Sequence, residues 1–375
     1  MAKKPKAVKK SGATDESLET LRAQIDALDV ELVALINRRA TVATRIGQLK
    51  ARDGRKAYAP SREKQVYERV GKLNQGPLPA EAFRSIYREI MSATIALEHP
   101  TRVCYFGKEG SNTHAAARSK FGSSVEYISG RDLRDVFLHV TRGWADYGLV
   151  PIENSTEGGV NQSIDLLAET RLKVASEIYL PIHHHLLSYA GLKEIKIVYS
   201  HPQAFAQCRT WMLGHMAEVE RKEVGSTSEA AEMAAKDHKA AAIAGGLAAE
   251  IYKVPIIEHN IEDQQDNITR FFVLSEQASE PTGNDKTSLV VSLKDAPGAL
   301  LRLLEPFQRH GINLSRIESR PNKRKAWEYN FFIDLHGHFK DAEVAATLKE
   351  LEICARHLEV LGSYPSAPRV PGKAG

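Results

Sequence analysis

Residues 261–274 have the sequence IEDQQDNITRFFVL, and this stretch decides how the middle of the chain folds. An acidic and amide-rich segment leads into four apolar residues, which is the pattern of a buried strand over 271–274. Asn267, Thr269 and Arg270 lie where the polar segment meets that strand. A guanidinium there can hold a carboxylate, and a hydroxyl can meet a departing hydroxyl group. A polar turn capped by Thr269 would explain the same residues, so the rest of the chain must decide.

Composition places the chain among ordinary globular proteins. Its 375 residues suffice for two or three domains, and 42% of them are hydrophobic and 26% charged. The lysine-rich residues 1–15 lack interleaved aromatics, so we expect a disordered tail and no nucleic-acid partner. No apolar run approaches the ~20 residues of a membrane helix, so we expect no membrane partner. Cys104, Cys208 and Cys354 are odd in number and far apart, which predicts reduced thiols and a cytoplasmic protein.

The N-terminal region is expected to be helical. Residues 16–50 contain no proline and repeat apolar residues at the spacing of one helix face. Such a helix would be about 50 Å long, much longer than the small domain around it. We therefore expect an intertwined dimer, in which a second copy covers the helix. Two shorter helices should follow, one from about residue 60 with Ser61 as its N-cap and one over 79–97.

Four cations in this region, Arg22, Arg39, Lys50 and Arg62, suggest an anion site. Arg39 and Lys50 are about three helical turns apart and share a face, although any one of the four alone would be interpreted as a solvated side chain. The stretches LRAQIDALDVELVALINRR, YAPSRE and REIMSATIALE, within residues 18–98, resemble the all-helical chorismate mutase family.

The chorismate mutase resemblance implies that the four cations bind the two carboxylates and the ether oxygen of chorismate. Glu63 would hold the substrate hydroxyl, and Thr94 and Glu98 stand where the family has a small hydroxyl and a Gln or Glu. The rearrangement is pericyclic, so fixed cations can select the compact conformer and stabilise charge on the ether oxygen without a nucleophile. Glu98 must be protonated to donate to that oxygen, which favours low pH. Ala59 replaces an acidic residue found in some members.

After residue 100, short apolar strands alternate with helices. We expect strands over 102–106, 147–151, 172–178, 196–200, 241–244 and 271–274, and helices over 226–236 and 246–252. Alternation of this kind predicts parallel sheets with ligand loops at the strand ends. A late return to a strand of the first lobe predicts two lobes with a cleft between them.

Three motifs occur in order in this region: VPIENSTEGGV at 150–160, SHPQAFAQC at 200–208 and NITRF at 267–271. They resemble prephenate dehydratase over residues 102–275, which implies a two-lobed fold similar to the type II periplasmic binding proteins. The resemblance assigns as catalytic the residues Glu153, Asn154, Ser200, Gln207 and Thr269. It assigns to substrate binding the residues Ser111, Thr113, Ser155, Arg270 and Phe271. The first loop departs from the family, with Lys108 in place of the usual proline and Asn112 in place of an aromatic residue.

The implied dehydratase chemistry suits these residue types. Prephenate loses carbon dioxide and its ring hydroxide together, so the departing hydroxyl needs a proton or a strong hydrogen bond. Thr269 is the candidate donor, and Asn154 and Gln207 are candidate positioning groups. Threonine is a weak acid, so a relay through water or Glu153 is an alternative. Arg270 either binds a substrate carboxylate or braces the loop, and the sequence leaves both roles open.

The triplet at 183–185, His-His-His, raises the question of a metal site. Zinc ligands converge from separated positions, whereas adjacent residues in an extended segment point alternately to opposite sides. We therefore favour a polar strand edge, and we expect no metal and no organic cofactor.

The polar residues 276–286 are expected to link to a last domain with the element order β-α-β-β-α-β, which is ferredoxin-like. The motifs Gly298-Ala299-Leu300 and Glu318-Ser319-Arg320-Pro321 make residues 287–363 resemble the ACT regulatory domain of phenylalanine-sensitive enzymes. We assign to phenylalanine binding the residues Gly298, Ala299, Leu300, Asn313, Leu314, Glu318, Ser319, Arg320 and Pro321, with Asp295 nearby. Many ferredoxin-like domains only pack and bind no ligand, which is the alternative.

Together these patterns predict a multidomain protein. We expect an all-α chorismate mutase domain over 16–100, an α/β two-lobed dehydratase domain over 101–280, an α+β ACT domain over 286–363, and disordered ends over 1–15 and 364–375. The expected function is conversion of chorismate to prephenate and then phenylpyruvate, by a homodimer or larger homo-oligomer inhibited by phenylalanine. The alternatives are arogenate dehydratase activity and a non-catalytic, amino-acid-sensing binding protein.

Overall fold

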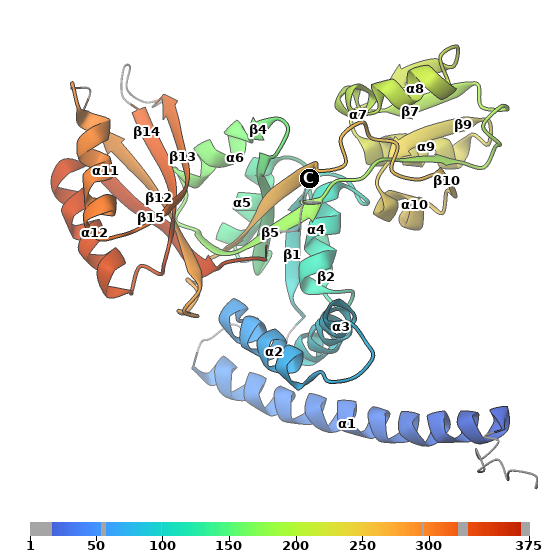
Figure 1. The fold of residues 1–375 in the computed structure, drawn as a ribbon, viewed down its shortest axis with the longest axis horizontal. Coiled ribbons are helices and arrows are strands. Elements are labelled where there is room, and N and C mark those ends of the chain that lie inside the picture. Colours follow the sequence, from blue (N-terminus) through green and yellow to red (C-terminus); the bar gives the residue numbers. More distant parts are fainter. Residues whose placement is uncertain (1–16, 54–57, 99, 295, 322–328, 369–375) are drawn as a thin grey trace, which may run out of the picture. The chain divides into compact units, whose positions relative to one another are not determined.

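The computed structural model describes residues 17–53, 58–98, 100–294, 296–321 and 329–368. The chain divides at residue 55 into two compact units, so the helical region expected over 16–100 spans both of them. The first unit contains α1, and the second contains every other described element (Figure 1). Across the described residues, no helix combines the length and apolar character that crossing a membrane requires.

The described residues of the first unit form one long helix, α1 (Leu18–Arg52), as the periodicity predicts. Ser17 caps it, because its hydroxyl accepts a hydrogen bond from the backbone N–H of Thr20 at 3.2 Å. The apolar residues of its first half are between 39% and 64% exposed in the single chain, namely Leu18, Leu21, Ile25, Leu28 and Leu32. A helix that leaves its apolar residues this exposed has a surface suited to burial against another chain.

Two helices, α2 (Pro60–Leu73) and α3 (Ala80–Glu98), begin the second unit. Ser61 is not the N-cap of α2, because the helix already begins at Pro60, whose fixed φ suits the first helical position. Just before α2, the Tyr58 ring packs against Phe121 and Tyr147, with ring centroids 5.0 and 5.2 Å apart. These contacts explain why α2 and α3 cluster with the following domain.

The first lobe of the α/β domain surrounds a mixed sheet with the order β2-β1-β3-β11-β5. Its strands are β1 (Arg102–Phe106), β2 (Glu126–Gly130), β3 (Tyr147–Asn154), β4 (Gly158–Gly159), β5 (Lys173–Pro181) and the returning β11 (Ile268–Ser275). Its helices are α4 (Asn112–Phe121), α5 (Leu133–Thr141) and α6 (Asn161–Leu167). The late return predicted from the sequence is therefore confirmed, with β11 inserted between β3 and β5.

The second lobe has a five-stranded sheet with the order β10-β6-β9-β7-β8. Its strands are β6 (His185–Ser188), β7 (Ile197–Ser200), β8 (Glu220–Glu223), β9 (Ala240–Ala244) and β10 (Ile256–Glu258). Its helices are α7 (Pro202–Gln207), α8 (Arg209–His215), α9 (Thr227–Lys236) and α10 (Gly246–Tyr252). The prediction of parallel sheets is wrong in part, because β11 runs antiparallel to β3 and β5, and β6 runs antiparallel to β9 and β10. A chain that leaves one lobe and later returns to it naturally adds a reversed strand.

The last domain has the predicted order of elements. These are β12 (Asp285–Leu293), α11 (Ala299–Arg309), β13 (Leu314–Pro321), β14 (Tyr329–His336), α12 (Ala342–Cys354) and β15 (His357–Pro365). The sheet order β13-β14-β12-β15 is that of a ferredoxin-like fold, with β13 at one edge.

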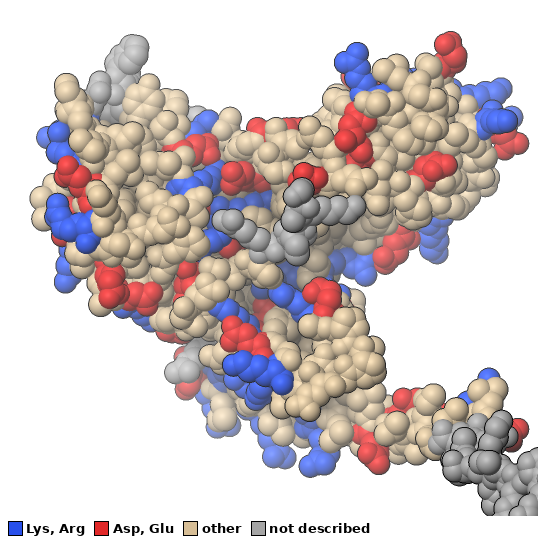
Figure 2. Space-filling model, viewed as in Figure 1, with Lys and Arg blue, Asp and Glu red and all other residues tan. Residues whose placement is uncertain are grey.

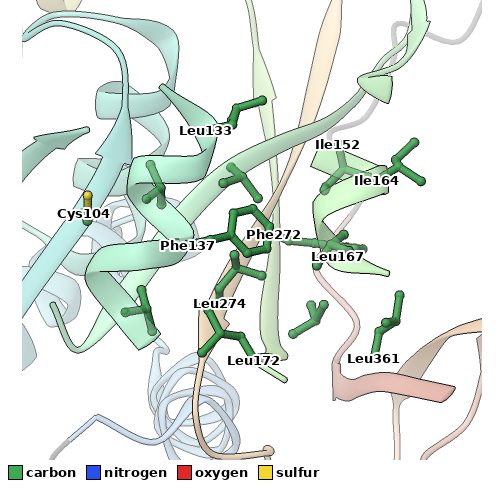
Figure 3. Packing of buried hydrophobic residues seen from close by; sticks show 14 of the residues in the cluster. Cys104, Leu133, Phe137, Ile152, Ile164, Leu167, Leu172, Phe272, Leu274 and Leu361 are labelled. Carbon is green, nitrogen blue, oxygen red and sulfur yellow. The ribbon is translucent and has the colours of Figure 1, made fainter. Parts of the chain in front are cut away.

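This last domain shares a hydrophobic core with the first lobe. Phe272 of β11 belongs to the same buried cluster as Phe332 of β14 and Leu361 of β15, part of which Figure 3 shows. Gly362 lies so close to β5 that an added Cβ would be 2.3 Å from the carbonyl oxygen of Val174. Only glycine permits this approach, so the two domains are packed backbone to backbone.

Charged side chains of both signs are interspersed over the face drawn in Figure 2. An even mixture of this kind gives little long-range attraction for a polyanion.

Candidate active sites

The candidate site of the α/β domain contains two side chains in contact, Asn154 and Thr269. These residues are direct partners in the antiparallel ladder between β3 and β11. The Asn154 amide donates to the Thr269 hydroxyl oxygen at 2.8 Å and to Oδ1 of Asn267 at 2.7 Å. A hydroxyl that accepts a hydrogen bond still has its own proton to donate, and the accepted bond polarises that O–H. Thr269 is therefore held as a donor.

The loop after β3 is organised by the other end of Asn154. Its Oδ1 accepts from the hydroxyl of Thr156 at 2.6 Å and from the backbone N–H groups of Thr156 and Glu157. Ser155 ties this loop to β11, because its hydroxyl accepts from the Ile268 N–H at 2.9 Å. Asn154 and Ser155 thus fix the loop as well as the site.

The second lobe contributes Gln207, at the end of α7. Its Oε1 accepts from Nε2 of His184 at 2.8 Å, and its amide nitrogen donates to Glu157 of the first lobe at 3.2 Å. Burial lowers the pKa of His184, so the ring is neutral and carries its proton on Nε2. His184 therefore sets which way the Gln207 amide faces, and Gln207 joins the two lobes.

Of the two roles that the sequence left open for Arg270, the contacts of its side chain are those that bracing requires. Its guanidinium is buried and donates to Glu177 at 2.9 Å and to the Tyr364 hydroxyl at 3.1 Å, and it pairs with Asp334 of the last domain. Burial works against this charge, but the neighbouring carboxylates outweigh it and raise the pKa of Arg270 further above its usual range. Because its donors are engaged by protein carboxylates, Arg270 is not available to a substrate.

Several other predicted residues are buried or make contacts within the protein. Phe271, predicted to bind substrate, is 1% exposed and lies in a hydrophobic cluster. Ser200 is fully buried and donates to the carbonyl of Ile243 at 2.8 Å, joining neighbouring strands. Ser111 is the N-cap of α4, and Thr113 is buried in its first turn. Glu153 is partly exposed and lies 3.6 Å from Nε of Arg316, on the same face of the sheet as its ladder partner Arg270.

The predicted mutase residues fall in both compact units. On α1, Arg22 is exposed, whereas Arg39 and Lys50 are partly buried. In the second unit, Arg62 is exposed and Glu63 is buried. Glu63 accepts from the Tyr58 hydroxyl at 2.8 Å and pairs with Lys120 at the same distance, so it anchors α2 to the first lobe of the α/β domain.

The two remaining mutase candidates lie on α3. Thr94 is buried and donates to the carbonyl of Ile90 at 2.6 Å, one turn earlier. Glu98, the last residue of the helix, is partly buried. Thr94 thus has the backbone bond typical of a helical threonine.

The three adjacent histidines diverge, as their alternating directions predict. His183 bonds to Glu262 at 2.8 Å, His184 to Gln207, and Nδ1 of His185 accepts from the Asn260 N–H at 3.1 Å. Among the described residues, no group of three or more His, Cys, Asp or Glu side chains is arranged to hold a metal ion.

A pocket of about 260 Å³ lies at the start of α11. Its lining is largely apolar and consists of Leu293, Lys294, Ala296, Gly298, Ala299, Leu300, Leu301, Tyr329 and Phe331. Gly298 adopts φ 74°, a left-handed conformation that glycine tolerates, and opens the helix. Three predicted residues thus line one pocket, while the predicted Asp295 lies outside the described residues.

The other residues predicted for phenylalanine binding lie on or near β13. Asn313 is exposed and Leu314 is partly buried. Glu318 pairs with Arg316 and lies against Gly159 of the first lobe, and Arg320 bonds to Asn161 of the same lobe at 2.5 Å. Ser319 and Pro321 are exposed. In the single chain this motif therefore faces the first lobe of the α/β domain.

Known proteins match this arrangement domain by domain. Family models match at residues 21–99 (chorismate mutase type II), 103–279 (prephenate dehydratase) and 287–353 (ACT domain). The bifunctional chorismate mutase/prephenate dehydratase of Aquifex aeolicus is 45% identical over 357 residues, which cover 94% of this chain and 99% of the relative. The chain belongs to the bifunctional chorismate mutase/prephenate dehydratase family.

Two solved structures each match about 70% of this family member. A prephenate dehydratase from Arthrobacter aurescens, solved with L-Phe, is 34% identical, with a TM-score of 0.66 and coverage of 72% of this chain and 93% of that one. A protein described as a novel type of quorum-quenching acylase also scores 0.66, at 27% identity, covering 71% and 98%. The shared scaffold therefore does not by itself determine the chemistry, and the site residues must.

Sequence reasoning missed several functional contacts of this bifunctional family member. His184 and Glu157, the partners of Gln207, were in quoted stretches but were not given this role. Glu177 and Asp334, the partners of Arg270, are each the single carboxylate of a largely buried strand. A lone carboxylate in a buried strand predicts a buried cation partner, and that signal was available.

Proposed function

We propose that this protein converts chorismate to prephenate in its helical domain and prephenate to phenylpyruvate at the Asn154–Thr269 pair. The observation that carries the dehydratase half is the hydrogen bond from Asn154 to Thr269, which leaves the threonine hydroxyl as a donor. We further propose a cytoplasmic homodimer or larger homo-oligomer, inhibited by phenylalanine.

The dehydratase step needs one proton and no redox change. The bond between the ring and its carboxylate breaks and releases carbon dioxide, while the freed electron pair makes the ring aromatic and expels the ring hydroxyl. Thr269 donates a hydrogen bond to that departing oxygen, which leaves as water once a proton reaches it. Asn154 orients Thr269, and Gln207 contributes from the second lobe. Donors aimed at developing charge stabilise the transition state more than the substrate.

The mutase step needs only positioning and positive charge, which Arg22, Arg39, Lys50 and Arg62 supply. The exposed apolar residues of α1 support a dimer in which the α1 helices of two copies cover each other. Arg22 then reaches the site of the other protomer. Fixed cations bind both carboxylates of chorismate and stabilise the ether oxygen as its bond breaks.

Phenylalanine binding is proposed at the pocket that lies at the N-terminal end of α11. Gly298 and Ala299 let the amino-acid head group approach the backbone at the helix N-terminus, and Leu300 and Leu301 face the ring. Tyrosine should bind more weakly, because its hydroxyl would be buried without a partner.

A coupled assay tests the whole proposal. Purified protein is incubated with chorismate alone, and prephenate and phenylpyruvate are followed together. We expect prephenate to appear first and phenylpyruvate after it, with inhibition by added phenylalanine. Accumulation of prephenate without phenylpyruvate would contradict the dehydratase assignment, and parallel reactions with prephenate and arogenate identify the preferred substrate.

A further inference from the structure

Four charged residues connect the ACT domain to the dehydratase site; we call Glu153, Arg270, Arg316 and Asp334 the four-charge cluster. Glu153 and Arg270 are direct partners in the β3–β11 ladder, one position along from the Asn154–Thr269 pair. Arg316 and Asp334 are likewise direct partners, in the β13–β14 ladder of the ACT sheet. Each pair holds one positive and one negative charge, so the two ladders face each other with complementary charges.

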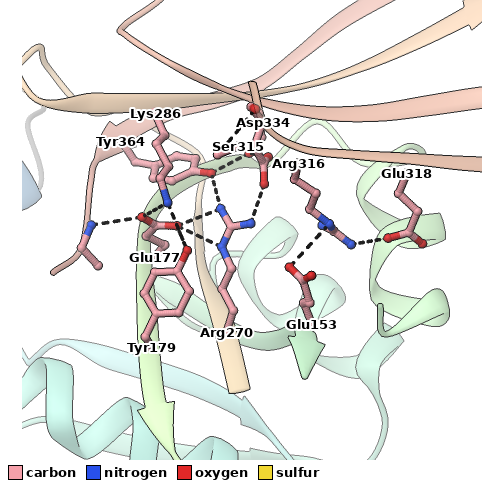
Figure 4. A network of polar contacts seen from close by, with 12 residues as sticks. Glu153, Glu177, Tyr179, Arg270, Lys286, Ser315, Arg316, Glu318, Asp334 and Tyr364 are labelled. Atoms are coloured by element: carbon pink, nitrogen blue, oxygen red, sulfur yellow. Dashed lines mark hydrogen bonds and ion pairs between the residues drawn. The ribbon is translucent and has the colours of Figure 1, made fainter. Parts of the chain in front are cut away.

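The Arg270 half of the four-charge cluster is deeply buried. Both Arg270 and Asp334 are 4% exposed, and they form an ion pair across the domain boundary (Figure 4). Burial raises the pKa of Asp334, but Arg270 and the hydroxyl of Ser288 outweigh it, so the net pKa lies below its usual range. Glu177 completes this half, since it pairs at 2.8 Å with Arg270 and also with Lys286 of the ACT domain.

The Glu153 half lies at the edge of the site. Arg316 is held between Glu153, at 3.6 Å, and Glu318 on its own strand (Figure 4). Glu318 in turn lies against Gly159, where an added Cβ would be 2.7 Å from a carboxylate oxygen. The site loop that contains Asn154 is thus bordered on this side by an ACT strand.

We propose that Arg316 and Asp334 of the ACT domain are positioning residues for the dehydratase reaction. They hold Glu153 and Arg270, and through these neighbours they fix the relative placement of Asn154 and Thr269. Side chains alternate along a strand, so Arg270 faces the ACT domain while Thr269 faces the site. A movement of the ACT sheet is therefore transmitted to both strands that carry the catalytic pair. The ACT domain supports catalysis even when no effector is bound.

The test compares charge-removing variants with a charge-keeping one. Arg316→Gln removes the cation that holds Glu153, and Arg316→Lys keeps a charge at the same place. Asp334→Asn addresses the other half of the cluster. Lys340→Gln is the matched control, because it breaks another ACT ion pair, Lys340 with Glu280 at 2.8 Å, at an exposed position. Circular dichroism confirms folding of each variant, and initial rates with added prephenate give kcat and KM.

We expect Arg316→Gln and Asp334→Asn to lower the dehydratase kcat about tenfold while KM changes less than about threefold, since a misplacement of about 1 Å costs up to ~10²-fold in rate. Arg316→Lys should recover most of the lost kcat, and Lys340→Gln should match the unaltered protein. Mutase activity should be unchanged in all four. Full dehydratase kcat in folded Arg316→Gln and Asp334→Asn proteins, or an equal loss in Lys340→Gln, would overturn the proposal.

A second measurement distinguishes the positioning role of Arg316 and Asp334 from the proposed inhibition by phenylalanine. The predicted change in inhibition rests on that proposed function. Calorimetry measures phenylalanine binding, and the rate assay measures inhibition. Arg316→Gln should bind phenylalanine about as well as the unaltered protein but be inhibited less, because the route to the site is weakened. If phenylalanine neither binds nor inhibits the unaltered protein, the regulatory assignment fails, and the kcat comparison still decides the role of the four-charge cluster.

Discussion

Replacing Thr269 with valine removes one hydroxyl and keeps the shape of the side chain. The hydroxyl accepts one hydrogen bond, from Asn154 at 2.8 Å, and that amide retains its bond to Asn267. The loss of stability should therefore be about 1 kcal/mol, the net worth of one hydrogen bond. Loss of a donor to developing charge costs about 10²–10³ in kcat, or roughly 3–4 kcal/mol of transition-state stabilisation. The catalytic cost thus exceeds the structural one.

Steady-state rates with prephenate measure this effect, and thermal unfolding measures stability. Thr156→Val is the matched control, because Thr156 donates its hydroxyl to the opposite end of the same Asn154 side chain. Backbone N–H groups still reach that oxygen, so the control should lose less than about threefold in kcat, consistent with one partly redundant bond. Thr269→Ser should retain most activity. A near-normal kcat for Thr269→Val, or an equal loss in Thr156→Val, would refute the donor role.

Three further predictions test other parts of the molecule. Arg39→Ala should lower mutase activity about 10²–10³-fold and leave dehydratase rates with added prephenate within about twofold, and equal loss of both activities would count against separate sites. Leu301→Asp, in the apolar pocket, should raise the phenylalanine concentration for half-inhibition about tenfold without changing the uninhibited rate. Burial lowers the pKa of His114 to about 4, so below about pH 6.5 the unfolded chain binds a proton that the folded chain does not. The free energy of unfolding should therefore fall by up to about 3 kcal/mol from pH 7 to pH 4. Denaturant titrations measure this dependence on pH, and His114→Asn should flatten it.

Much of the fold followed from local patterns. The apolar period of α1 and the apolar runs of β12 and β14 predicted elements within a few residues, because both patterns reflect local chain geometry. The direction of β11 did not follow, since a buried strand has the same apolar pattern whether it runs parallel or antiparallel. Sheet direction depends on the route of the chain, which is not a local property.

In the candidate site, the sequence predicted contacts only between residues that belong to the three motifs. Asn154 and Thr269 are 115 positions apart and meet as the three motifs imply. The partners of Arg270 and Glu63 were not predictable in this way, because Asp334 and Lys120 belong to other domains. A charged residue shows its type in the sequence but not its burial, and burial decides whether an arginine binds a substrate or a protein carboxylate.

The register of β11 is constrained from two sides at once. Thr269 and Phe271 face one side of the sheet and Arg270 the other, so a slip of one residue would exchange the threonine and the arginine. The arginine would then face Asn154, while Glu177 and Asp334 would be left buried without their cation. An uncompensated buried charge costs about 3–5 kcal/mol, so domain docking opposes the slipped strand more strongly than the loss of one active-site bond does. The same ion pairs that attach the ACT domain therefore keep the Thr269 hydroxyl on the same face of the sheet as Asn154.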